Sequence, residues 1–254
     1  MNPDSDSFST TPSVGRLIQH LVSVAVLLAT IFITFSPRLF LGDFGATILA
    51  LLTPQPVSDV SGAATRQAIR IGIVSGHWSN SEDQGAVCED GTTEAAVNYK
   101  IASLAAQMLE AQGYTVDLLQ EFDSRLQGYR AAALVSIHND SCVDQGPDAS
   151  GYKVVAALGT HDRNLANRLV ACLTDRYGRT TGLKFHPGSI TRDMTEYHAF
   201  DEIDPATTAA IIETGFLYRD YQLLTTQPGL VAQGVVNGIL CFLRNENVDL
   251  NFRP

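Results

Sequence analysis

The sequence predicts a single α/β domain with a mostly parallel central sheet flanked by helices, preceded by an N-terminal membrane segment. Beyond residue 68, short apolar strand patterns alternate with helical patterns, which is typical of layered α/β folds. Polar residues follow three of the expected strands, and this is where such sheets bind ligands. A long apolar run near the N-terminus indicates the membrane segment.

The N-terminal part of the chain changes character twice before the folded domain begins. Residues 1–16 are rich in Ser, Thr, Pro and Asp without apolar periodicity, so we expect them to be disordered. Residues 17–35 are apolar enough to span a bilayer, and a shorter apolar stretch follows them. A cleaved signal peptide is the alternative, but no small-residue cleavage site follows Phe35. We therefore predict a membrane anchor region over 17–52 and a linker of small and turn-forming residues over 53–68.

Composition excludes some classes of function. The formal net charge is −10, from 17 Lys and Arg against 27 Asp and Glu, whereas nucleic-acid binding needs clustered basic residues. The four cysteines form no C-x-x-C pair, which argues against a zinc ribbon or a thioredoxin-type motif. Their even number allows two disulfides in an exported domain, while in a cytosolic protein they would be buried thiols.

Five apolar patterns indicate strands within residues 69–254. The first is the clearest, because Ile69, Ile71 and Ile73 alternate and lead into Val74. The remaining patterns are short apolar or β-branched runs bounded by turn-forming residues. In chain order, the five expected strands cover residues 69–74, 114–119, 132–137, 152–158 and 207–212.

Three helices are expected between and after these strands. The first lies beyond Gly91 and is followed by Gly113, which stands where a helix C-cap belongs. The third is the apolar run over residues 230–243. The apolar residues that mark the first two helices are Val97, Ile101, Leu104 and Met108, and then Leu165, Leu169 and Leu173.

Four polar residues stand at the ends of these elements. His77 follows the first strand, His138 follows the third, and Glu213 follows the last. If these strands are parallel neighbours, their side chains converge at one edge of the sheet. Glu94 opens the first helix, which must pack back onto the sheet from that edge. Two histidines and a glutamate can hold a catalytic zinc ion with one position open, and a further carboxylate can act as general base.

Each of these residues also has an ordinary structural explanation. The helix dipole alone favours Glu94 in a first helical turn. His77 fits an ordinary loop position, His138 a hydrogen-bonded core position, and Glu213 a buried ion pair. Their joint placement favours a functional site, because buried imidazoles and carboxylates need partners to offset desolvation. For His198 we favour an exposed loop position over contact with a substrate.

Four segments that contain these residues occur in order: IVSGH at 73–77, GTTEAAVN at 91–98, VSIH at 135–138 and IIETGF at 211–216. Together they resemble the motif set of the zinc-dependent N-acetylmuramoyl-L-alanine amidases of the amidase-3 family. The resemblance covers about residues 69–243 and implies an α/β sheet flanked by helices, so that residues 69–254 would be a zinc amidase catalytic domain.

The resemblance also implies the roles of the site residues. Zinc would be held by His77, Glu94 and His138, with Glu213 as the catalytic carboxylate. The implied reaction hydrolyses the amide between N-acetylmuramic acid and L-alanine in peptidoglycan. The implied partners are peptidoglycan and, through the N-terminal segment, a membrane, with the catalytic domain outside the cytoplasm.

Three departures from the family pattern keep alternatives open. Trp78 replaces the small residue usual after the first histidine, Asn139-Asp140 stands in place of Ala-Asn, and the stretch over residues 122–133 is short. A zinc amide hydrolase with another substrate is therefore one alternative. A catalytically silent cell-wall binding module is the other, and the retention of Glu213 together with the three ligands argues against it.

The same arrangement suggests how the cysteines pair. Cys88 lies in the loop after the first histidine and Cys142 just beyond the second, so both loops leave the same edge of the sheet. We therefore predict a Cys88–Cys142 disulfide, which leaves Cys172 and Cys241 as the second pair, although spacing alone does not determine connectivity.

Overall fold

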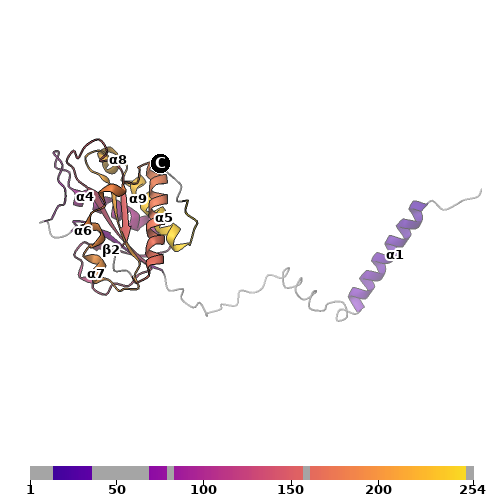
Figure 1. Cartoon of the computed structure of the whole chain (residues 1–254). Coiled ribbons are helices and arrows are strands. Elements are labelled where there is room, and N and C mark those ends of the chain that lie inside the picture. The colour runs from indigo at the N-terminus through magenta and orange to yellow at the C-terminus, as the bar shows by residue number, and fades with distance from the viewer. Residues whose placement is uncertain (1–13, 36–68, 79–82, 157–160, 250–254) are drawn as a thin grey trace, which may run out of the picture. The chain divides into compact units, whose positions relative to one another are not determined.

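The computed structural model describes residues 14–35, 69–78, 83–156 and 161–249. The chain divides into two units, Met1–Ala64 and Thr65–Pro254. In the first unit, helix α1 spans Val14–Phe35 (Figure 1). Among the described residues, no helix is long and apolar enough to cross a membrane.

Helix α1 begins earlier than the apolar run suggested. Residues 14–16, which we expected to be disordered, form its first turn because the helical backbone continues past the apolar residues. The other predictions for the N-terminal part, at residues 1–13 and 36–68, lie outside the described residues.

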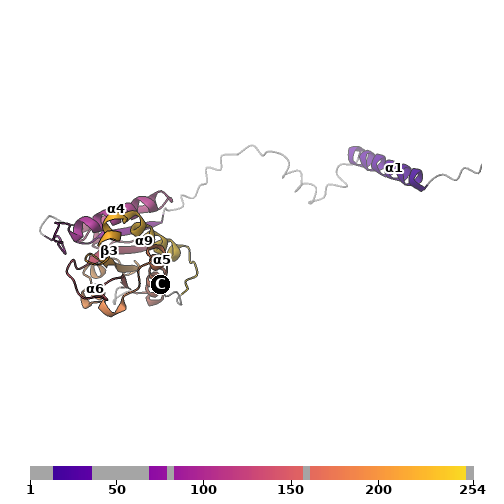
Figure 2. The ribbon, with the colours of Figure 1, turned by 90° about the horizontal axis from the view of Figure 1, so that it is seen from above.

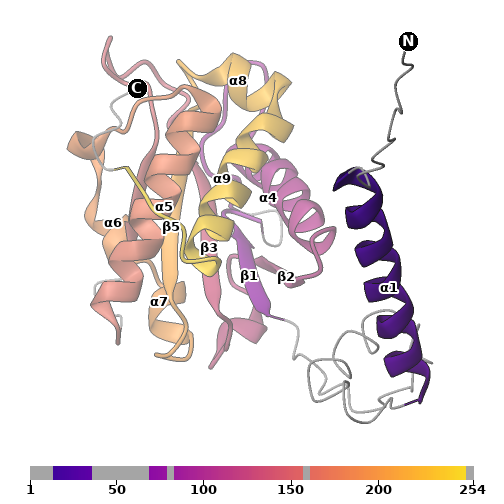
Figure 3. The same cartoon turned by 90° about the vertical axis from the view of Figure 1, so that its right-hand side faces the viewer.

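The second unit is built on a five-stranded sheet with the strand order β2-β1-β3-β5-β4. Strands β2, β1, β3 and β5 can be followed in this order in Figure 3. Strands β2, β1, β3 and β5 run parallel, and β4 is antiparallel to β5, so the predicted mostly parallel sheet is confirmed. The strands span Arg70–Ser75 (β1), Thr115–Gln120 (β2), Ala133–Asp140 (β3), Lys153–Ala156 (β4) and Ala209–Phe216 (β5).

Helices cover both faces of this sheet (Figure 2). The three long helices pack on one face; they are α4 (Glu94–Glu110), α5 (Arg163–Thr181) and α9 (Pro228–Leu243), and α8 (Tyr221–Thr226) precedes α9. Among the described residues, the elements on the other face are short: the 3₁₀ turns η1 (Ser124–Leu126) and η2 (Pro187–Ser189), and helices α6 (Arg192–Thr195) and α7 (Ala199–Glu202). The three expected long helices are thus confirmed.

The two cores follow from the alternation of side chains along the strands. Ile71 and Ile73 of β1 face the long helices, whereas Val74 faces the short ones. On β5, Ile212 faces the long helices and Ile211 the short ones. Side chains two residues apart along a strand therefore lie on the same face, and this alternation determines which polar residues lie on the face that carries the short elements.

Two local predictions need correction. Gly113 does not cap α4: the cap residue is Ala111, and Gly113 lies two residues later with φ +87°. Strands β3 and β5 continue through His138 and Glu213 instead of ending before them, because backbone pairing does not depend on the side chain carried. These two residues face each other in the parallel ladder.

Both predicted disulfides are present. Cys88 and Cys142, with Cα atoms 5.2 Å apart, join the loop before α4 to the loop after β3. Cys172 and Cys241 join α5 to α9. The first bridge ties together two loops at the carboxyl edge of the sheet, and the second braces the helical layer.

Candidate metal centre and active site

His77 is placed by a tight turn at the end of β1. Its backbone has φ +56°, an uncommon conformation for a residue with a side chain. Gly76 precedes it and passes very close to the ring of His138, where an added Cβ would lie 2.2–2.4 Å from the ring atoms. The turn therefore brings two imidazoles from neighbouring strands together, with ring centroids 5.2 Å apart.

Glu94 is held firmly at the start of α4. Thr93 caps this helix by accepting a hydrogen bond from the backbone N–H of Ala96. The buried Glu94 carboxylate accepts hydrogen bonds from the Asn98 side chain and from the backbone N–H of Asn139, both at 3.2 Å. Its orientation is thus fixed by protein groups on two different elements.

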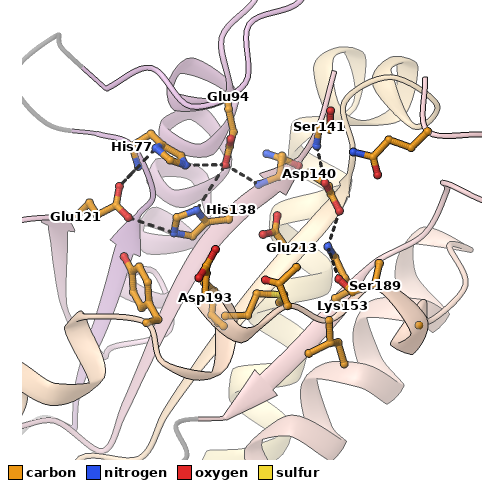
Figure 4. Close-up of a pocket in the computed structure, with 18 residues that line it drawn as sticks. His77, Glu94, Glu121, His138, Asp140, Ser141, Lys153, Ser189, Asp193 and Glu213 are labelled. Atoms are coloured by element: carbon orange, nitrogen blue, oxygen red, sulfur yellow. Dashed lines mark hydrogen bonds and ion pairs between the residues drawn. The ribbon is translucent and has the colours of Figure 1, made fainter. Parts of the chain in front are cut away.

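The three predicted ligands converge. Glu94 Oε1 lies 3.4 Å from His77 Nε2 and 3.5 Å from His138 Nδ1 (Figure 4). Neighbouring ligand atoms of a tetrahedral zinc site with bonds of about 2.0–2.1 Å lie about 3.3 Å apart. The donor set and its spacing therefore fit a zinc ion.

The charges around this group also favour a cation. Burial alone would raise the pKa of Glu94, but hydrogen bonding to His138 and the charges of the two imidazoles lower it. Burial disfavours the charged form of His138, yet Glu94, Glu213 and Glu121 together raise its pKa. Several carboxylates thus share two imidazoles, and a bound divalent ion would offset their negative charge.

Glu213 lies next to this group on the face with the short helices. It is opposite His138 on one neighbouring strand and opposite Lys153 on the other, as Figure 4 also shows. Burial raises the pKa of Glu213 to about 7, and its Oε2 atom has no hydrogen-bond partner among the described residues. A carboxyl group of this kind is suited to exchanging protons near neutral pH.

All four residues border or line one pocket of about 650 Å³. His77, Glu94, His138 and Glu213 lie along it, as predicted from the sequence. Ile190, Met194 and Tyr197 form an apolar wall on the side of the short helices. The pocket is therefore a cleft in which a substrate can meet the candidate metal ligands and Glu213 together.

Two charged residues of this pocket, Glu121 and Lys153, were not identified from the sequence. Glu121 follows β2 directly, so the rule that identified the histidines at strand ends applies to it as well. Lys153 is buried and forms an ion pair with Asp140, and its Nζ also donates to the Ser189 carbonyl at 3.3 Å. Lys153 opens the antiparallel strand β4, so no search for residues after strands could find it.

His198 is not the exposed loop residue that we expected. It stands at the start of α7, half-buried, with its ring stacked on Phe122 at 4.4 Å. Its Nδ1 lies 3.0 Å from Glu202 and its Nε2 3.8 Å from Glu121. Packing of α7 against the sheet accounts for this burial, and it places His198 behind the candidate metal centre.

The chain is similar to known amidases in sequence and in structure. The family described as N-acetylmuramoyl-L-alanine amidase matches residues 71–241. No curated protein matches the chain. Among solved structures, the CwlD amidase from Clostridioides difficile, in complex with the GerS lipoprotein, is similar with a TM-score of 0.56 and 19% identity; the match covers 70% of this chain and 100% of that one.

Two further solved structures agree in fold. The N-acetylmuramoyl-L-alanine amidase AmiC2 of Nostoc punctiforme has a TM-score of 0.55 and 21% identity, covering 69% of this chain and 97% of that one. An N-acetylmuramoyl-L-alanine amidase from Clostridium difficile 630 has a TM-score of 0.56 and 20% identity, covering 71% and 99%. At these identities the structures support the fold of the second unit.

Proposed function

Because the chain belongs to the N-acetylmuramoyl-L-alanine amidase family, we propose that it uses zinc to hydrolyse the amide between N-acetylmuramic acid and L-alanine in peptidoglycan. The family makes the protein a cell-wall amidase that acts on peptidoglycan. The use of zinc and the identity of the bond that is cleaved are what we propose beyond the family. The observation that carries them is the convergence of His77, Glu94 and His138 in one pocket with Glu213.

Each of these residues has a role in the proposed reaction. His77, Glu94 and His138 would hold the metal, and the bound zinc would supply a Lewis acid that polarises the scissile carbonyl and lowers the pKa of water. Glu213 takes a proton from the water whose oxygen adds to the carbonyl carbon. As the C–N bond breaks, Glu213 returns that proton to the departing nitrogen of L-alanine. The products are a carboxyl group on the sugar side and a free amine on the peptide side.

We further propose that the catalytic domain works outside the cytoplasm. Peptidoglycan lies there, and disulfides such as Cys88–Cys142 and Cys172–Cys241 persist in oxidising compartments. Attachment to a membrane through residues 17–52 stays a prediction from the sequence.

Digestion of purified peptidoglycan tests the reaction. The protein should release peptides that begin with a free L-alanine amine, and new amino termini can be labelled and identified by mass spectrometry. A strong chelator should abolish this release, and added zinc should restore it. Release of a different amine would support the alternative zinc amide hydrolase, and full activity in chelator would contradict the role of zinc.

A further inference from the structure

A second carboxylate faces both candidate ligand imidazoles. Glu121 Oε2 lies 3.7 Å from His77 Nδ1, and Glu121 Oε1 lies 3.9 Å from His138 Nε2. Glu94 faces the other nitrogen of each ring. The four side chains thus form a closed ring in which carboxylates and imidazoles alternate (Figure 4).

The geometry separates the two nitrogens of each imidazole. The atoms with the spacing of a zinc site are His77 Nε2, His138 Nδ1 and Glu94 Oε1. The remaining nitrogens, His77 Nδ1 and His138 Nε2, would then carry hydrogens and point to the side of Glu121. His138 Nε2 is buried without a hydrogen-bond partner among the described residues, so Glu121 is the acceptor group that faces it.

Glu121 is itself held in place by groups other than the atoms that would bind the metal. Its Oε2 accepts a hydrogen bond of 2.5 Å from the backbone N–H of His77, in the turn with the uncommon φ. Its Oε1 lies 3.8 Å from His198 Nε2, and His198 is tied in turn to Glu202. The carboxylate is buried, and the hydrogen bond from the His77 backbone orients it.

We propose that Glu121 positions both ligand histidines for zinc, an inference that rests on the proposed metal centre. The negative charge of this one carboxylate, 3.7–3.9 Å from the non-coordinating nitrogen of each ring, favours a hydrogen on that nitrogen and so leaves the other nitrogen free to bind zinc. Asp83 also approaches His77 Nδ1, at 2.9 Å, but its side chain is half exposed to solvent. Asp83 approaches only the ring of His77 in these contacts, whereas the buried Glu121 carboxylate faces both rings.

The zinc dissociation constant of Glu121→Gln tests this role without an activity assay. The amide keeps the shape of the side chain but removes its charge. Partners of metal-ligating histidines typically contribute 10–100-fold to metal affinity, so zinc should bind about 10–100-fold more weakly, as measured by competition with a chromophoric chelator. The visible spectrum of the cobalt-substituted variant should also change, because the ligand rings reorient.

Two further variants complete the experiment. Glu196→Gln removes an exposed carboxylate paired with Arg192 and should leave zinc affinity unchanged. Glu94→Gln removes a proposed ligand and should lose far more affinity than Glu121→Gln. Thermal unfolding of the metal-free proteins verifies that each variant folds.

The outcomes distinguish the inference from the proposed function. Zinc affinity of Glu121→Gln within twofold of wild type would overturn the positioning role. A loss as complete as that of Glu94→Gln would overturn it too, since Glu121 would then be a ligand. Failure of the wild-type protein to bind zinc would instead overturn the proposed function.

Discussion

Gly76 controls how closely the end of β1 approaches the ring of His138. Any Cβ at this position would overlap the imidazole, at 2.2–2.4 Å from its atoms. We predict that Gly76→Ala displaces His138 and leaves less than about half of the wild-type zinc per chain. Overpacking of this kind typically costs about 1–3 kcal/mol, so the midpoint of chemical unfolding should also fall.

Gly229→Ala is the matched control for this change. An added Cβ at Gly229 meets nothing within 4 Å, so zinc content and stability should stay close to wild type. Metal analysis gives the zinc per chain of both variants, and urea unfolding gives their midpoints. Full zinc content in Gly76→Ala would show that the ring of His138 has room to move.

Among single residues, the sequence identified those that follow parallel strands. His77, His138 and Glu213 could be predicted because parallel strands bring their carboxyl ends to one edge. Lys153 could not, because an antiparallel strand reaches that edge with its first residue. Glu121 also follows a parallel strand, but it lies outside the four segments that resemble the amidase motifs. The structure shows that it faces both imidazoles.

Among the elements, α5 and α9 are joined by the bridge between Cys172 and Cys241. Both cysteines are fully buried, and the bridge closes a span of 69 residues. We predict that Cys172→Ala with Cys241→Ala lowers the free energy of unfolding by about 2–4 kcal/mol, the usual range for a native disulfide. Denaturant unfolding under non-reducing conditions measures this loss.

The same double variant should keep its zinc. The two helices lie on the face of the sheet opposite the short elements that wall the pocket, so the candidate ligands lose no contact with them. Cys88→Ala with Cys142→Ala is the comparison, because that bridge joins the loops beside His77 and His138. Unchanged stability in the α5–α9 variant would contradict the bracing role.

The existence of each element was easier to predict than its limits. Alternating apolar residues identified β1, and helical spacing identified α4, since burial imposes both periods. The ends of β3 and β5 could not be found this way, because ladder hydrogen bonds are made by the backbone and continue through polar residues. The pattern of apolar side chains therefore does not indicate where such a strand ends.

For the whole molecule, the order of strands and helices was sufficient to predict the α/β class. Thr65 begins the unit that holds the sheet and the pocket. We predict that a chain starting at residue 65 unfolds cooperatively and binds as much zinc as the full chain.

If residues 17–52 anchor the protein, cell fractionation should find the full chain with membranes and the shorter chain in the soluble fraction. Recovery of both in the soluble fraction would contradict the anchor.

In the proposed reaction, Glu213 acts as the proton-transferring base beside a zinc ion that it does not bind. Glu213→Gln keeps the shape of the side chain and removes the base. The measurement is the rate of L-alanine amine release from peptidoglycan, with zinc per chain determined on the same sample. General acid–base catalysis typically contributes about 10²–10⁴-fold, so we predict a loss of that order with about one zinc ion per chain retained. Retained activity, or loss of zinc together with activity, would contradict this role of Glu213.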